Sequence, residues 1–110
     1  MQAADRAWTD AINLDPTNSS AWSNRGTSRL QFGYWDDARA DLLKAYDLES
    51  ANGKVSGVLL NQLGNADGAV GKWEVACQHY LQAAEYSPEL ESIANANLAL
   101  AYCQLQVRHA

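Results

Sequence analysis

Apolar and small residues recur at helical spacing along the chain, and they do so twice in nearly the same order. In the first occurrence, Trp22, Gly26 and Leu30 stand four residues apart, which places them on one side of a helix. In the second occurrence, Leu60 and Gly64 keep the same spacing. An internal repeat of this kind predicts a stack of similar helical units.

Each of these first helices is followed by a glycine and then by a second amphipathic helix. Gly33 and Gly71 are expected to end the first helices, because glycine adopts the left-handed conformation after a helix without steric cost. The second helices match residue by residue, with Trp35, Ala38, Leu42 and Ala45 in one and Trp73, Ala76, Tyr80 and Ala83 in the other. The pattern predicts one antiparallel helix pair over 19–50 and another over 57–88.

The pattern also extends beyond both pairs. Residues 1–15 are predicted to form the second helix of a preceding unit, since Trp8 precedes its counterpart Leu42 by 42 − 8 = 34 residues. Residues 90–106 are predicted to form the first helix of a further repeat, or a capping helix. The expected fold is therefore all-α, a single module over 1–110 with about six helices in stacked antiparallel pairs.

These residues resemble the tetratricopeptide repeat (TPR) family, which has a period of 34 residues, and the resemblance covers essentially the whole chain. It implies a right-handed superhelix, or α-solenoid, with a concave groove lined mainly by the first helix of each pair. It also implies a protein–protein interaction scaffold or adaptor without catalytic chemistry. By that geometry, the groove is expected to carry a row of hydroxyl and amide side chains: Ser23, Asn24, Thr27, Gln31, Asn61, Gln62, Asn65, Asn97 and Gln104.

Two interpretations of this polar row are open. Asn and Gln each offer a donor and an acceptor, so the row suits the backbone of an extended partner segment. Alternatively, the family favours Asn near these sites for bonds within its own chain. One subclass of the family binds acidic chaperone C-termini through Lys, Arg and Asn. The positions that would carry its cations hold Ser23, Val58, Ile93 and Asn97, which disfavours that ligand.

The chain departs from the family pattern in three places. Leu42 and Tyr80 are 80 − 42 = 38 residues apart, so four extra residues lie around 51–57. A longer loop or an extra helical turn would accommodate them, and a partner-contact loop is the alternative. Arg29 and Asp67 occupy equivalent positions that usually hold an aromatic residue, which suggests an ion pair between them. The Asn, Asp and Gly residues of 65–71 favour an early helix end or local fraying.

Composition and charge narrow the function further. A net charge of −5 argues against a nucleic acid or an anionic membrane as the main partner, and no apolar run approaches the roughly 20 residues of a membrane span. Cys77 and Cys103 are expected to be reduced and partly buried, which favours the cytosol or an organelle interior. Neither has the set of closely spaced Cys or His neighbours that forms a zinc site, and His79 is expected on or near the outer face. We therefore expect no enzyme activity, metal or cofactor.

A self-assembly role is the alternative to a scaffold. The chain starts with a second helix and ends with a first helix, each lacking the partner that a complete pair would give it. Several apolar residues spread around the last helix: Ile93, Leu98, Leu100, Tyr102, Leu105 and Val107. Either the segment belongs to a longer array, or the end helices pair with a second copy. The expected partners are thus a protein or peptide segment, or another copy of the chain.

Overall fold

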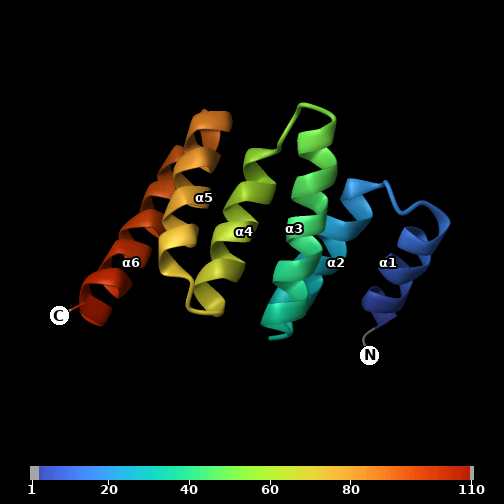
Figure 1. Cartoon of the computed structure of the whole chain (residues 1–110), viewed down its shortest axis with the longest axis horizontal. Helices are drawn as coiled ribbons and strands as arrows, with labels where there is room; N and C mark the ends of the chain where they lie inside the picture. The colour runs from blue at the N-terminus through green and yellow to red at the C-terminus, as the bar shows by residue number, and fades with distance from the viewer. Residues whose placement is uncertain (1–2, 110) are drawn as a thin grey trace. The chain divides into compact units, whose positions relative to one another are not determined.

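The computed structural model describes residues 3–109, and this part of the chain is entirely helical apart from short connections. The side chains of residues 3, 4, 90–92, 94, 99, 103 and 106–109 lie outside the description. The elements, in order, are α1 (Ala3–Leu14), α2 (Ser19–Gln31), α3 (Trp35–Ala51), α4 (Gly57–Ala69), α5 (Trp73–Tyr86), the 3-10 turn η1 (Pro88–Leu90) and α6 (Glu91–His109) (Figure 1). The predicted all-α class of paired helices is confirmed.

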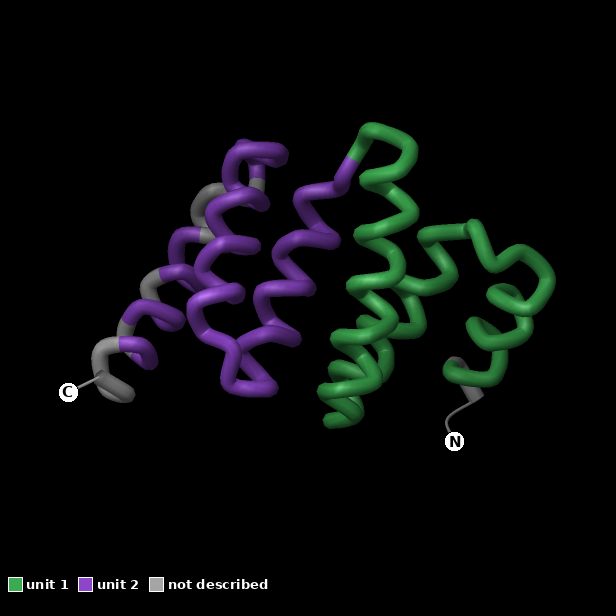
Figure 2. Tube along the Cα trace, in the orientation of Figure 1, with its two compact units in different colours: residues 1–54 green, residues 55–110 purple. Residues whose placement is uncertain are grey.

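The helices fall into two compact units, Met1–Lys54 and Val55–Ala110 (Figure 2). In the first unit, α2 packs against both α1 and α3. In the second unit, α5 packs against both α4 and α6. Each unit is therefore one helix pair with one additional helix packed against it.

Local sequence explains where several helices begin and end. Asn18 caps α2 by accepting the Ser20 backbone N–H at 3.1 Å, and Ser56 caps α4 through the N–H of Leu59 at 3.4 Å. Gly33 and Gly71 have φ values of 84° and 82°, as predicted for residues that end a helix. The residue after Gly33 then donates its N–H to Arg29 O at 2.9 Å, which satisfies a carbonyl at the end of α2.

Close contact within each helix pair depends on a glycine. A Cβ atom on Gly26 would lie 2.8 Å from Leu42 Cγ, and one on Gly64 would meet the ring of Tyr80. The missing side chains allow α2 to approach α3, and α4 to approach α5, at this point. The residues packed there are almost fully buried: Ala38, Leu42, Ala45, Ala76, Tyr80 and Ala83.

Two of the departures from the repeat pattern, the extra residues around 51–57 and the stretch 65–71, lie partly or wholly within helices. The extra residues lengthen α3 to 17 residues, against 14 in α5, before a short connection leads to α4. The expectation that α4 ends early is wrong, because α4 continues to Ala69. Gly68 is helical and buried, and the indole ring of Trp73 occupies the space where a side chain would lie. Tertiary packing therefore overrides the poor helix propensity of this stretch.

Candidate functional site

The first part of the predicted polar row lies on α2, in the first unit. Asn24 and Gln31 are exposed, whereas Ser23 and Thr27 are partly buried. Ser23 donates its hydroxyl to the carbonyl oxygen of Ser20 at 3.2 Å, a bond within the helix. Positions 23, 27 and 31 are four residues apart, so these side chains share one side of α2.

The remainder of the row lies on α4 and α6, in the second unit. Asn97 donates its side-chain amide to Asn61 Oδ1 at 3.1 Å, which joins the two helices directly. On α4, Asn65 donates to Gln62 Oε1 at 3.4 Å and accepts the Tyr80 hydroxyl at 2.6 Å. Gln104 is exposed on α6, whereas Asn61, Gln62, Asn65 and Asn97 are partly buried. Intrachain bonds therefore use part of the polarity of this row, and its binding to a partner stays a prediction.

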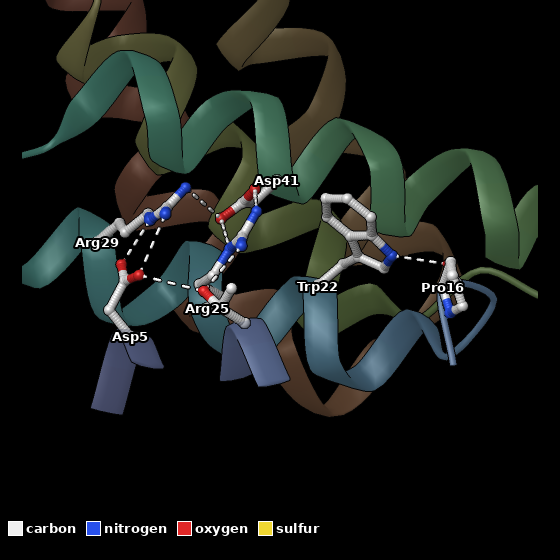
Figure 3. Close-up of polar contacts among 7 residues, drawn as sticks. Asp5, Pro16, Trp22, Arg25, Arg29 and Asp41 are labelled. Carbon is white, nitrogen blue, oxygen red and sulfur yellow. Dashed lines mark hydrogen bonds and ion pairs between the residues drawn. The ribbon is translucent and has the colours of Figure 1, made fainter. Parts of the chain in front are cut away.

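A network of partly buried ion pairs in the first unit was not predicted from the sequence (Figure 3). Arg25 donates from Nε and Nη2 to the two carboxylate oxygens of Asp41, each at 2.8 Å, and from Nη1 to Thr9 at 3.0 Å. Arg29 reaches Asp41 at 3.1 Å and Asp5 at 2.6 Å. The network thereby connects α1, α2 and α3. Two arginines four residues apart on one helix are the sequence feature that could have indicated a shared partner.

These contacts perturb the ionisation of the residues that form them. The hydrogen bond from Arg29 lowers the pKa of Asp5 below its ordinary value, and the same contact raises the pKa of Arg29. The side chain of Asp41 is only 4% exposed, against 13% for Arg25 and 19% for Arg29. Both cations of α2 are therefore held by carboxylates of their own unit.

Trp22 forms a hydrogen bond with the connection between α1 and α2. Its indole N–H donates to the carbonyl oxygen of Pro16 at 2.9 Å (Figure 3). The Arg25 guanidinium lies 5.2 Å from the centroid of the Trp22 ring, and the Lys44 ammonium lies 6.0 Å from it. Both distances are within the range of attraction between a cation and an aromatic face.

The second unit has a buried polar contact of its own. Asp67 is fully buried, and its Oδ2 lies 2.5 Å from Nδ1 of His79. The expectation that His79 lies on or near the outer face is therefore wrong, since its side chain is 13% exposed and contacts a buried carboxylate. Arg29 contacts Asp5 and Asp41, and Asp67 contacts His79. The suggested ion pair between Arg29 and Asp67 is not among these contacts.

Burial also changes the chemistry of two side chains on α5. It raises the pKa of the Tyr80 hydroxyl to about 12, and the nearby carboxylate of Asp67 adds to the increase. It likewise raises the pKa of the Cys77 thiol, which is free and buried. Cys103, predicted to resemble Cys77, lies outside the described side chains.

Two kinds of feature are absent from the part of the chain that the structure describes. Among the described residues, no group of three or more His, Cys, Asp or Glu side chains is arranged to hold a metal ion. None of the helices in the described part has the length and apolar character needed to cross a membrane.

Comparison with known proteins gives one partial similarity. No family model matches the chain. Hsp70-Hsp90 organizing protein 2 of Arabidopsis thaliana is 37% identical over 54 residues, which is 49% of this chain. The match covers 10% of that protein, so about half of this chain is similar to a small part of it.

Proposed function

We propose that this chain is a TPR-type protein-interaction module that binds a partner protein through the polar row, with the residues on α2 contributing in the first unit and those on α4 and α6 in the second. The repeated helix pairs support this proposal, as does partial similarity to a protein named as an organizer of Hsp70 and Hsp90. The observation that carries it is that the row stays accessible. Asn24 and Gln31 are exposed on α2, and the bonded Asn61 and Asn97 keep part of their surface open.

The proposed role is binding rather than catalysis. Arg25 and Arg29 engage the buried carboxylate of Asp41, and His79 engages that of Asp67, so both carboxylates take part in contacts of their own unit. An acidic chaperone tail is not the ligand we propose, since Arg25 and Arg29 are bound to carboxylates of their own unit. The free thiol of Cys77 supports a reducing compartment, the cytosol or an organelle interior.

Substitutions in the row test this function. The tagged chain is used to capture and identify partners by mass spectrometry, and the variants Asn24→Ala and Asn61→Ala are compared with it. We expect both to weaken capture of the same partner while helicity by circular dichroism is unchanged. Asn13→Ala, an exposed amide on α1 outside the row, serves as the matched control. Equal capture by all four proteins would contradict the proposal.

Self-association is a second candidate, favoured by incomplete burial of the end helices. Trp8 and Ala11 on α1 are partly exposed, whereas Leu42 and Ala45, their counterparts on α3, are 0% exposed. On α6, Leu98 and Leu105 pack against the α5 core, but Ile93, Leu100 and Tyr102 are 49–57% exposed. Val107, also expected at this surface, lies outside the described side chains. A second copy could cover the exposed apolar residues.

Light-scattering mass over a concentration series tests this second candidate. A stable dimer that Leu100→Asp or Tyr102→Asp converts to a monomer would support association through α6. A mass near 12.0 kDa at every concentration would reject it and leave the polar row available to another protein.

A further inference from the structure

In the second unit, one side of α4 and one side of α6 meet at a side-chain hydrogen bond, and we call the residues on these two sides the α4–α6 face. Its members on α6 recur at intervals of four, three and four residues, and those on α4 recur at three or four, so each set shares one side of its helix. The hydrogen bond from Asn97 to Asn61 places the two sets next to each other. The face consists of Val58, Asn61, Gln62, Asn65, Ile93, Asn97, Leu100 and Gln104.

Three aliphatic residues of this face are more than half exposed. Val58 is 57% exposed, Ile93 is 54% exposed and Leu100 is 57% exposed. The side of α6 that packs against α5 is a different one, formed by Leu98, Ala101 and Leu105. Covering the exposed aliphatic groups with a ligand would remove apolar area from water, which favours binding.

Asn61 and Asn97 together offer one hydrogen-bond donor and one acceptor to a peptide group of a ligand. Their mutual bond uses Oδ1 of Asn61 and one proton on Nδ2 of Asn97. Nδ2 of Asn61 can still donate, and Oδ1 of Asn97 can still accept. A ligand backbone presents a matching C=O and N–H only where it is extended, because a helix consumes both groups internally.

The absence of charged residues from the face, together with the net charge of the chain, disfavours acidic ligands. None of its eight residues is Asp, Glu, Lys or Arg, and the chain as a whole carries a net charge of −5. A ligand with carboxylates would lose hydration without gaining a cation, and it would be repelled by the net charge. A neutral or basic ligand has neither cost.

We propose that the α4–α6 face binds an extended segment of a partner protein that carries aliphatic side chains and lacks acidic ones. One peptide group of that segment lies against Asn61 and Asn97, and its side chains cover Leu100, Ile93 and Val58. This inference rests on the proposed function and specifies the chemistry of its ligand.

The test uses the whole chain, labelled with nitrogen-15, and a library of short peptides with acetylated and amidated ends. The library has aliphatic residues at alternating positions, and two matched sets carry either Asp in their place or N-methyl groups on the backbone. We expect aliphatic peptides to shift the side-chain amide signals of Asn61 and Asn97 in NMR spectra. The Asp and N-methylated sets should bind more weakly.

Variants assign the binding to this face. Leu100→Gln should weaken the best aliphatic peptide about ten-fold, because it removes an apolar contact. Leu14→Gln is the matched control, since Leu14 is 88% exposed on α1, outside the face. An unchanged affinity in Leu100→Gln, a preference for the Asp set, or no binding by any aliphatic peptide would overturn the inference. The capture experiment with Asn24→Ala is independent, so the proposed function can hold where this inference fails.

Discussion

Arg25 and Asp41 join α2 to α3 through two parallel contacts of 2.8 Å, one from Nε and one from Nη2. Bidentate pairs of this kind fix orientation as well as distance, and a lysine could not reproduce them. Asp41 is 3% exposed and also accepts from Arg29, so a single buried carboxylate holds two cations. Removing Asp41 would leave both guanidinium groups without this partner in a largely dry site.

We therefore expect Asp41→Ala to lower the free energy of unfolding by about 3 kcal/mol, near the lower end for a broken buried pair because both arginines retain some access to water. Urea unfolding followed by circular dichroism measures the change. Asp47→Ala is the matched control, since Asp47 is exposed on the same helix. If the two variants lose the same stability, the network contributes nothing specific.

The Asp5–Arg29 contact predicts a dependence of stability on pH. The pKa of Asp5 is lowered in the folded chain, so its charge stabilises the fold at neutral pH. That contribution is lost as the pH falls below the ordinary value for an aspartate and through the lowered one. Wild type should therefore exceed Asp5→Asn in thermal stability at neutral pH, and the difference should shrink as the pH falls below the ordinary aspartate value of about 3.9. Asp10→Asn, an exposed neighbour on α1, is the matched control, measured at the same pH values.

The paired helices were predictable because they follow local rules. Gly33 ends a helix because glycine can adopt a positive φ. Trp22 and Gly26 are four residues apart, and this spacing alone places them on one side of a helix. The ion partners were not predictable in the same way. Asp5 and Arg29 are 24 residues apart, and only the packing of α1 on α2 brings them together.

For the polar row, too, the sequence predicted which residues share a helix side but not which of them bond to each other. Helical spacing was enough to group Asn61 with Asn65 on one helix. It could not give the bond between Asn61 and Asn97, which depends on how α4 and α6 lie in the second unit. The continuation of α4 through Gly68 was missed for a related reason. Propensity describes an isolated helix, whereas here the ring of Trp73 fills the space beside the glycine.

Gly64→Ala tests the close approach of α4 to α5. On an exposed helix this change would stabilise by up to about 1 kcal/mol, since Ala is the better helix former. Here the new Cβ would meet the ring of Tyr80, so we expect a net loss of about 1–3 kcal/mol from overpacking. The sign of the change in urea unfolding decides the matter. A stabilised variant would mean that the two helices can separate at no cost.

Tyr80 predicts loss of stability at alkaline pH. Its hydroxyl is buried and donates to Asn65 Oδ1 at 2.6 Å, and its pKa is raised to about 12. An unfolded tyrosine ionises near pH 10, so the folded chain holds this proton more tightly between the two values. The stabilising contribution is complete below about pH 10 and is lost as the pH rises through about 12, a difference on the order of 2 kcal/mol.

Tyr80→Phe should remove this part of the pH dependence and lower stability at neutral pH by about 1 kcal/mol through the lost bond. Ultraviolet titration of phenolate formation in the two proteins measures the ionisation directly. If the wild-type spectrum minus that of Tyr80→Phe shows a phenolate forming near pH 10 while the chain is still folded, the hydroxyl is not held as the structure shows.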